Sequence, residues 1–158
     1  MKFDFEGVKA RDMIPYGQAV QASDFETMAV ILAERVVECP AEWGDPKNPD
    51  TYLDGSFEDV TKPAFTALAE WYPKLTGVKA EFDTRKVTGR QMFKLNKAGT
   101  VDVEFWAGVL ATTTVKVLYD GKAWIKGDLS KPETYLGLDY GVFRWLLNEL
   151  VDDIRGEG

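Results

Sequence analysis

Residue types that commonly carry out catalysis are scarce in this chain of 158 residues. The chain contains no histidine, which is the commonest general base and the commonest protein ligand of zinc and copper. None of its serines, Ser23, Ser56 and Ser130, lies in the Gly-x-Ser-x-Gly sequence of a hydrolase nucleophile. A glycine-rich phosphate-binding sequence is also absent. We therefore predict that the protein is not an enzyme and binds no cofactor.

One acidic loop and one cysteine are the remaining candidates for metal binding. Asp45, Asn48 and Asp50 crowd into one loop, and Asp54 follows them. Their spacing does not match a calcium-binding loop, and such side chains commonly form turns instead. Cys39 is the single cysteine, which excludes an internal disulfide and fits a reducing cytoplasm. We interpret it as a structural thiol and predict no metal site.

A five-residue sequence near the middle of the chain recurs near its end. Residues 49–53 read Pro-Asp-Thr-Tyr-Leu, and residues 132–136 read Pro-Glu-Thr-Tyr-Leu, at an offset of 83. Other matches at this offset pair Gly44, Asp45 and Phe57 with Gly127, Asp128 and Tyr140. Matches at an offset of 79 pair Phe3, Asp4, Val8, Arg11 and Met13 with Phe82, Asp83, Val87, Arg90 and Met92. The ordered matches indicate duplication of a unit of about 80 residues.

Apolar spacing and capping sequences predict the helices. A 3-4-3-4 spacing of apolar residues predicts helices at 57–72 and 139–155, the first interrupted by Pro63. A capping box at 23–26 opens a helix over about 24–38, and a second at 88–91 opens a helix that ends before Gly99. Near the start of each half, residues 2–8 and 78–87 alternate loosely between apolar and polar. We interpret these two segments as short strands or extended arms.

Residues 102–126 give conflicting signals. Their position in the repeat favours a helix, which we predict for 102–112. The segment then becomes β-branched, and Asp120-Gly121 is a common two-residue hairpin turn. Helix and hairpin therefore stay open alternatives for 113–126.

The predicted fold is mainly α with minor β. Two tandem repeats, 1–76 and 77–158, each contain a short extended arm or strand plus two to three helices, and we expect them to pack as one compact unit. A unit of this small size buries too little surface to be very stable alone. The expected shared core consists of Phe25, Leu32, Val60, Trp71, Phe105, Phe143, Leu147 and Leu150.

The composition narrows the choice of partners. The formal net charge of −7 repels phosphate backbones, so we expect no nucleic-acid partner. No apolar run approaches the length of a transmembrane helix, and the N-terminal residues do not resemble a signal peptide. We expect a cytoplasmic protein that has no membrane partner, and the sequence does not predict its oligomeric state.

Aromatic residues are the candidates for a protein-binding surface. Tyr52 and Tyr135 each stand beside a leucine in the repeated sequence, and five tryptophans are many for a chain of this size. The alternative is that each Tyr-Leu pair anchors its loop on the core, with the phenol bonded to the main chain. The candidate protein-binding residues are Tyr52, Leu53, Tyr135, Leu136, Trp43 and Trp124.

The segments 87–92, 102–105 and 127–136 together resemble tail assembly chaperones of long-tailed bacteriophages and neighbouring small phage tail proteins. The resemblance implies a small helical protein that binds a tape-measure or tail-tube protein in the host cytoplasm. It implies no catalytic residues. The alternatives are a stable structural component of a phage particle and a host adaptor module.

Overall fold

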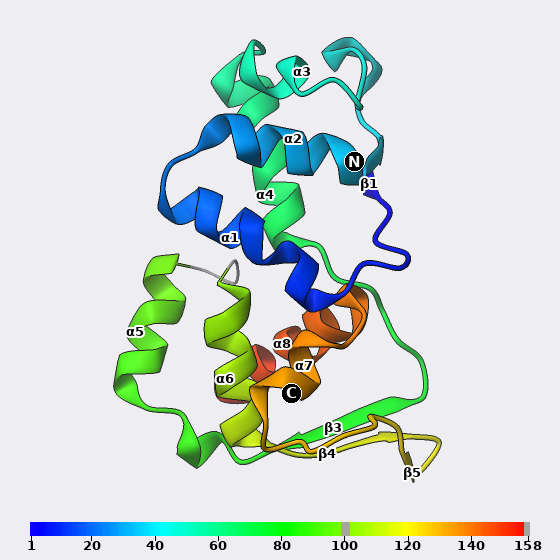
Figure 1. The fold of residues 1–158 in the computed structure, drawn as a ribbon, viewed down its shortest axis with the longest axis vertical. Helices are drawn as coiled ribbons and strands as arrows, with labels where there is room; N and C mark the ends of the chain where they lie inside the picture. The colour runs from blue at the N-terminus through cyan, green and yellow to red at the C-terminus, as the bar shows by residue number, and fades with distance from the viewer. Residues whose placement is uncertain (99–101, 157–158) are drawn as a thin grey trace. The chain divides into compact units, whose positions relative to one another are not determined.

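The computed structural model describes residues 1–98 and 102–156 and is mainly helical with small sheets (Figure 1). The predicted class, mainly α with minor β, is confirmed at this level. The chain divides into two compact units: unit 1 comprises Met1–Glu6 and Pro15–Trp71, and unit 2 comprises Gly7–Ile14 and Tyr72–Gly158. These units differ from the predicted repeats, because residues 7–14 and 72–76 belong to unit 2.

Unit 1 contains one antiparallel strand pair and a set of helices. Its elements are β1 (Lys2–Phe3), α1 (Ile14–Gln21, whose first residue belongs to unit 2), α2 (Phe25–Arg35), β2 (Val36–Glu38), the 3₁₀ turn η2 (Ala41–Trp43), α3 (Asp50–Leu53), the π-helical turn η3 (Phe57–Thr61) and α4 (Lys62–Glu70). The helix predicted over 24–38 is too long, because residues 36–38 leave the helix and pair with β1. The first helix of the unit begins after a separate 3₁₀ turn, with Pro15 in its opening turn, where proline is tolerated.

Unit 2 contains a three-stranded antiparallel sheet in the order β3-β4-β5, together with the longest helix of the described chain. Its elements are η1 (Ala10–Met13), β3 (Val78–Phe82), η4 (Thr84–Lys86), α5 (Gly89–Ala98), α6 (Val103–Thr113), β4 (Thr114–Tyr119), β5 (Lys122–Ala123), α7 (Pro132–Leu136) and α8 (Tyr140–Ile154). The open question at 113–126 is answered by a hairpin. Its turn places Asp120 at φ 49° and Gly121 at φ 78°, which are the two positive φ angles of a type I′ turn.

Local capping explains where several helices begin. The Thr88 N–H donates to Gln91 Oε1 at 2.9 Å, and the Gln91 N–H donates to Thr88 Oγ1 at 3.2 Å, as predicted for a capping box. Asp24 and Asp102 cap α2 and α6 by accepting a main-chain N–H three residues later. The predicted stop at Gly99 lies outside the described residues.

The predicted core is correct for five residues and wrong for three. Leu32, Val60, Phe143, Leu147 and Leu150 are buried. Phe25 is instead 56% exposed, and Trp71 and Phe105 are half-buried. The Trp71 ring packs on Phe5, with centroids 4.3 Å apart. None of the helices in the described chain is long and apolar enough to span a membrane.

Candidate protein-binding site

The first copy of the repeated sequence forms a short helix, α3, instead of the loop expected between the longer helices. The Tyr52 hydroxyl donates to the main-chain oxygen of Pro46 at 2.7 Å. The Thr51 hydroxyl donates to the main-chain oxygen of Asp45, also at 2.7 Å, and Asp45 Oδ1 accepts from the Lys47 N–H. The two hydroxyl bonds tie the preceding loop to the helix, and the Asp45–Lys47 bond forms a turn within that loop.

The second copy forms α7 and makes the corresponding bonds. The Tyr135 hydroxyl donates to the main-chain oxygen of Leu129 at 2.6 Å. The Thr134 hydroxyl donates to the main-chain oxygen of Asp128 at 2.6 Å, and Asp128 Oδ1 accepts from the Ser130 N–H. The spacing of donor and acceptor is six residues for each hydroxyl in both copies. The recurring threonine and tyrosine therefore have a structural explanation.

Both tyrosines are fully buried, so neither side chain offers exposed surface in this structure, and their part in binding a partner stays a prediction. Their exposed fraction is 0%. Burial raises the pKa of Tyr52 to about 12 and also raises the pKa of Tyr135, so both phenols stay protonated hydrogen-bond donors at neutral pH. Leu53 and Leu136 are half-buried. The predicted alternative, in which the tyrosines brace the loops, agrees with these positions.

An N-terminal arm, residues 7–14, is part of unit 2 and is hydrogen-bonded to the turn between α7 and α8. The Ala10 N–H donates to the Leu138 main-chain oxygen at 2.8 Å. In the opposite direction, the Tyr140 N–H donates to the Val8 main-chain oxygen at 2.7 Å. We call residues 136–140 the acceptor turn of unit 2. The two bonds fix the start of α8 against the arm.

Side chains of the arm reinforce this contact. Lys9 Nζ lies 2.8 Å from Asp139 Oδ1, and Arg11 Nε donates to the Leu136 main-chain oxygen at 3.3 Å. A Cβ atom at Gly137 would lie 2.9 Å from Arg11 Nη2, so glycine allows the guanidinium to approach the turn. Lys9 and Asp139 are half-exposed, and their ion pair therefore adds little stability by itself.

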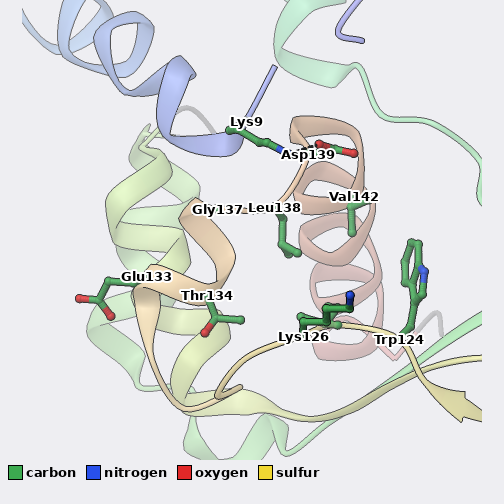
Figure 2. Close-up of a pocket in the computed structure, with 10 residues that line it drawn as sticks. Lys9, Trp124, Lys126, Glu133, Thr134, Gly137, Leu138, Asp139 and Val142 are labelled. Carbon is green, nitrogen blue, oxygen red and sulfur yellow. Dashed lines mark hydrogen bonds and ion pairs between the residues drawn. The ribbon is translucent and has the colours of Figure 1, made fainter. Parts of the chain in front are cut away.

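A hollow of about 450 Å³ lies beside the acceptor turn in unit 2. Figure 2 shows Trp124 and Val142 on one side of it, Thr134 on the other, and the Lys126 side chain between them. Glu133 points away from the centre. The lining residues are Lys9, Trp124, Ile125, Lys126, Glu133, Thr134, Gly137, Leu138, Asp139 and Val142.

The hollow has apolar walls and charged groups around them. Trp124 is 36% exposed, and its ring lies 6.0 Å from the Tyr119 ring on the β4–β5 hairpin. Leu138 and Val142 supply aliphatic surface, and the lining contains no serine, cysteine or histidine. In the described part of the chain, no group of three or more acidic, cysteine or histidine residues could hold a metal ion. The arrangement suits an apolar side chain whose neighbours are polar.

The six predicted binding residues belong to two different units. Trp124 lines the hollow, and Tyr135 and Leu136 lie in α7 beside it. Tyr52, Leu53 and the half-buried Trp43 belong to unit 1. Sequence reasoning missed Lys9, Asp139 and Val142. Lys9 and Asp139 are 130 positions apart, and no periodic or local signal connects residues so distant in the chain.

No family model, no curated protein and no solved structure matches this chain. The function therefore has to be inferred from the site itself.

Proposed function

We propose that the protein acts by binding another protein and catalyses no reaction. The observation that carries this proposal is Trp124, a partly exposed indole at the wall of a hollow with aliphatic lining and a charged margin. Tryptophan is enriched among residues that dominate the energy of protein interfaces. An apolar or aromatic side chain of the partner would enter the hollow and pack on the indole.

The surrounding charges support a protein partner with a mixed polar surface. Lys126 is exposed, and Glu133 lies on the other side of the hollow. A polar rim around an apolar centre is the usual arrangement of a protein interface. The opposite charges at this rim would fix the orientation of the partner more than they would raise its affinity.

For the partner, we propose a tape-measure or tail-tube protein. The support is the sequence resemblance to phage tail assembly chaperones, carried by the segments 87–92, 102–105 and 127–136. In that role the protein would act in the host cytoplasm and leave before the particle is complete. A stable component of the particle and a host adaptor module are the alternatives.

We also propose that the chain consists of two tandem repeats, 1–76 and 77–158. The matching hydroxyl bonds of α3 and α7 support the duplication. A second similarity also supports the duplication. Strand β2 follows α2 directly and strand β4 follows α6 directly, and each of these strands contains one valine that has no partner residue on the neighbouring strand. These residues, Val37 and Val115, are 51% and 52% exposed. Such bulges are retained features of a fold and not random irregularities.

Truncation of the indole tests the proposed site. Trp124→Ala should weaken binding to co-expressed tape-measure or tail-tube protein by about tenfold to a hundredfold, because the partner's side chain loses the wall on which it packs. The measurement is isothermal titration of the purified proteins. The melting temperature should change little, because Trp124 is partly exposed. Phe25→Ala, another exposed aromatic truncation, is the matched control. Equal binding by Trp124→Ala and wild type would refute the site.

Sedimentation separates the chaperone from a structural component. A chaperone should be absent from particles purified by density gradient and present in the soluble fraction of infected cells. A structural component should sediment with the particles at a fixed copy number. Quantitative immunoblotting of both fractions measures the difference.

A further inference from the structure

Two phenylalanines are the most exposed large apolar side chains of the described residues. Phe57 in unit 1 is 63% exposed, and Phe93 in unit 2 is 75% exposed. In the repeated sequence, each of the two phenylalanines corresponds to a residue in the contact between the N-terminal arm and the acceptor turn of unit 2. Phe57 occupies the position of Tyr140 at the offset of 83, and Phe93 occupies the position of Ile14, the last residue of the arm, at the offset of 79.

At two of its positions the turn at residues 53–57 has nearly the same backbone angles as the acceptor turn of unit 2. Asp54 has φ −100° and ψ −9°, and its counterpart Gly137 has φ −85° and ψ −7°. Ser56 has φ −56° and ψ 128°, and its counterpart Asp139 has φ −55° and ψ 138°. We call residues 53–57 the acceptor turn of unit 1. The agreement at these two positions supports a similar arrangement of the main-chain groups that would receive an arm.

The acceptor turn of unit 1 has no arm bonded to it among the described residues. The Tyr140 N–H donates to Val8, whereas the Phe57 N–H has no partner in the part of the chain that the structure describes. Tyr140 is 7% exposed, and Phe57 is 63% exposed. An arm in the corresponding place would satisfy this N–H and cover the phenylalanine ring.

The segment at residues 87–93 has the features of such an arm. The Thr88 N–H donates to Gln91 Oε1 at 2.9 Å, as the Lys9 N–H donates to Asp12 Oδ2 at 2.8 Å. The sequence matches pair Val8, Arg11 and Met13 with Val87, Arg90 and Met92. We call residues 87–93 the second arm.

The second arm and the acceptor turn of unit 1 carry opposite charges. Residues 84–94 include four basic side chains and no acidic one: Arg85, Lys86, Arg90 and Lys94. Residues 50–59 include four acidic side chains and no basic one: Asp50, Asp54, Glu58 and Asp59. In the described chain neither Arg90 nor Asp54 forms an ion pair, although a few of their neighbours do. Complementary charge of this kind favours association in a defined orientation.

We propose that the second arm of one molecule docks on the acceptor turn of unit 1 in a second copy of this chain. The proposal rests on the duplication proposed above, because it repeats between molecules the contact that the N-terminal arm makes within unit 2. Donor and acceptor are different surfaces, so each copy can bind one neighbour on each side. Such head-to-tail contacts form rings or open chains.

Arg90 and Asp54 form the central contact of this interface. Arg90 occupies the position of Arg11, whose guanidinium donates to the Leu136 main-chain oxygen beside Gly137. Where Arg11 passes close to Gly137, Arg90 meets Asp54, whose carboxylate accepts from the guanidinium. The ion pair between Arg90 and Asp54 therefore takes the place of the close contact between Arg11 and Gly137 within unit 2.

Two charge-reversal variants test the proposal in the full chain. Sedimentation velocity over about a hundredfold range of concentration should show wild-type protein associating beyond a dimer. Arg90→Glu destroys the donor and Asp54→Arg destroys the acceptor, so each variant alone should stay monomeric, with association weakened at least about tenfold. An equimolar mixture should associate again as wild type does, because Asp54→Arg keeps its donor, Arg90→Glu keeps its acceptor, and the two reversed charges attract each other at the alternate contact.

Matched controls reverse exposed charges outside the interface. Lys79→Glu and Glu26→Arg should associate as wild type does, and circular dichroism should show all variants folded. A wild-type protein that stays monomeric over the whole range would overturn the proposal, as would closure of the arm on its own molecule. A mixture that contains only monomers, or a single variant that associates like wild type, would also overturn it. The Trp124 binding assay is independent of these results, so failure of one proposal leaves the other to be judged separately.

Discussion

Replacing Tyr135 by alanine is expected to lower the free energy of unfolding by about 3–5 kcal/mol, the range found for large buried aromatic truncations. Tyr135 is fully buried, and its hydroxyl holds the Leu129 carbonyl. The truncation removes the ring, leaves a cavity beneath α7 and deprives that carbonyl of its partner. Urea unfolding followed by tryptophan fluorescence and circular dichroism measures the change.

Two further variants separate the ring from the hydroxyl. Tyr135→Phe keeps the ring and should cost about 1 kcal/mol, the usual net value of one hydrogen bond. Tyr52→Ala should destabilise the protein by a smaller amount than Tyr135→Ala, because Tyr135 precedes the more apolar helix. If Tyr135→Ala unfolds at the same urea concentration as wild type, the bracing role assigned to the tyrosine is wrong.

Features decided by neighbouring residues could be predicted from the sequence. The capping box at Thr88 and Gln91 depends on side chains three positions apart, and it forms as expected. The hairpin turn at Asp120-Gly121 depends on two residues that tolerate positive φ, and local preference prevailed there over the helix that the repeat favoured. Both features are visible within a few residues of sequence.

Features decided by distant segments could not be predicted. The helix expected to extend to residue 38 ends at Arg35, because residues 36–38 pair with β1 at the start of the chain. The candidate site depends on Lys9 reaching Asp139 across most of the sequence. Nothing near either residue signals the other, so the hollow became visible only with the tertiary structure.

The buried face of α6 could not be read from periodicity. Buried residues occur around much of the helix: Val103, Trp106, Ala107, Val109, Leu110, Ala111 and Thr113. A helix that is apolar on most sides gives no clear stripe. The sequence therefore suggested Phe105 as the core residue, whereas the structure buries Trp106, which is 1% exposed.

Trp106→Ala should consequently be among the most destabilising substitutions in the protein, with a loss of about 3–5 kcal/mol in the free energy of unfolding. The indole is the largest of the fully buried side chains in the described chain, so its removal leaves a large cavity in unit 2.

Phe105→Ala is the matched control on the adjacent residue. The two rings touch edge to face, with centroids 5.2 Å apart, but Phe105 is half-buried and its ring lies under Lys94 Nζ. Its truncation should cost about 1–2 kcal/mol, because part of the ring already contacts water. Parallel urea titrations of the two variants measure the difference. A larger loss from Phe105→Ala than from Trp106→Ala would mean that the helix presents the face suggested by the sequence and not the face seen in the structure.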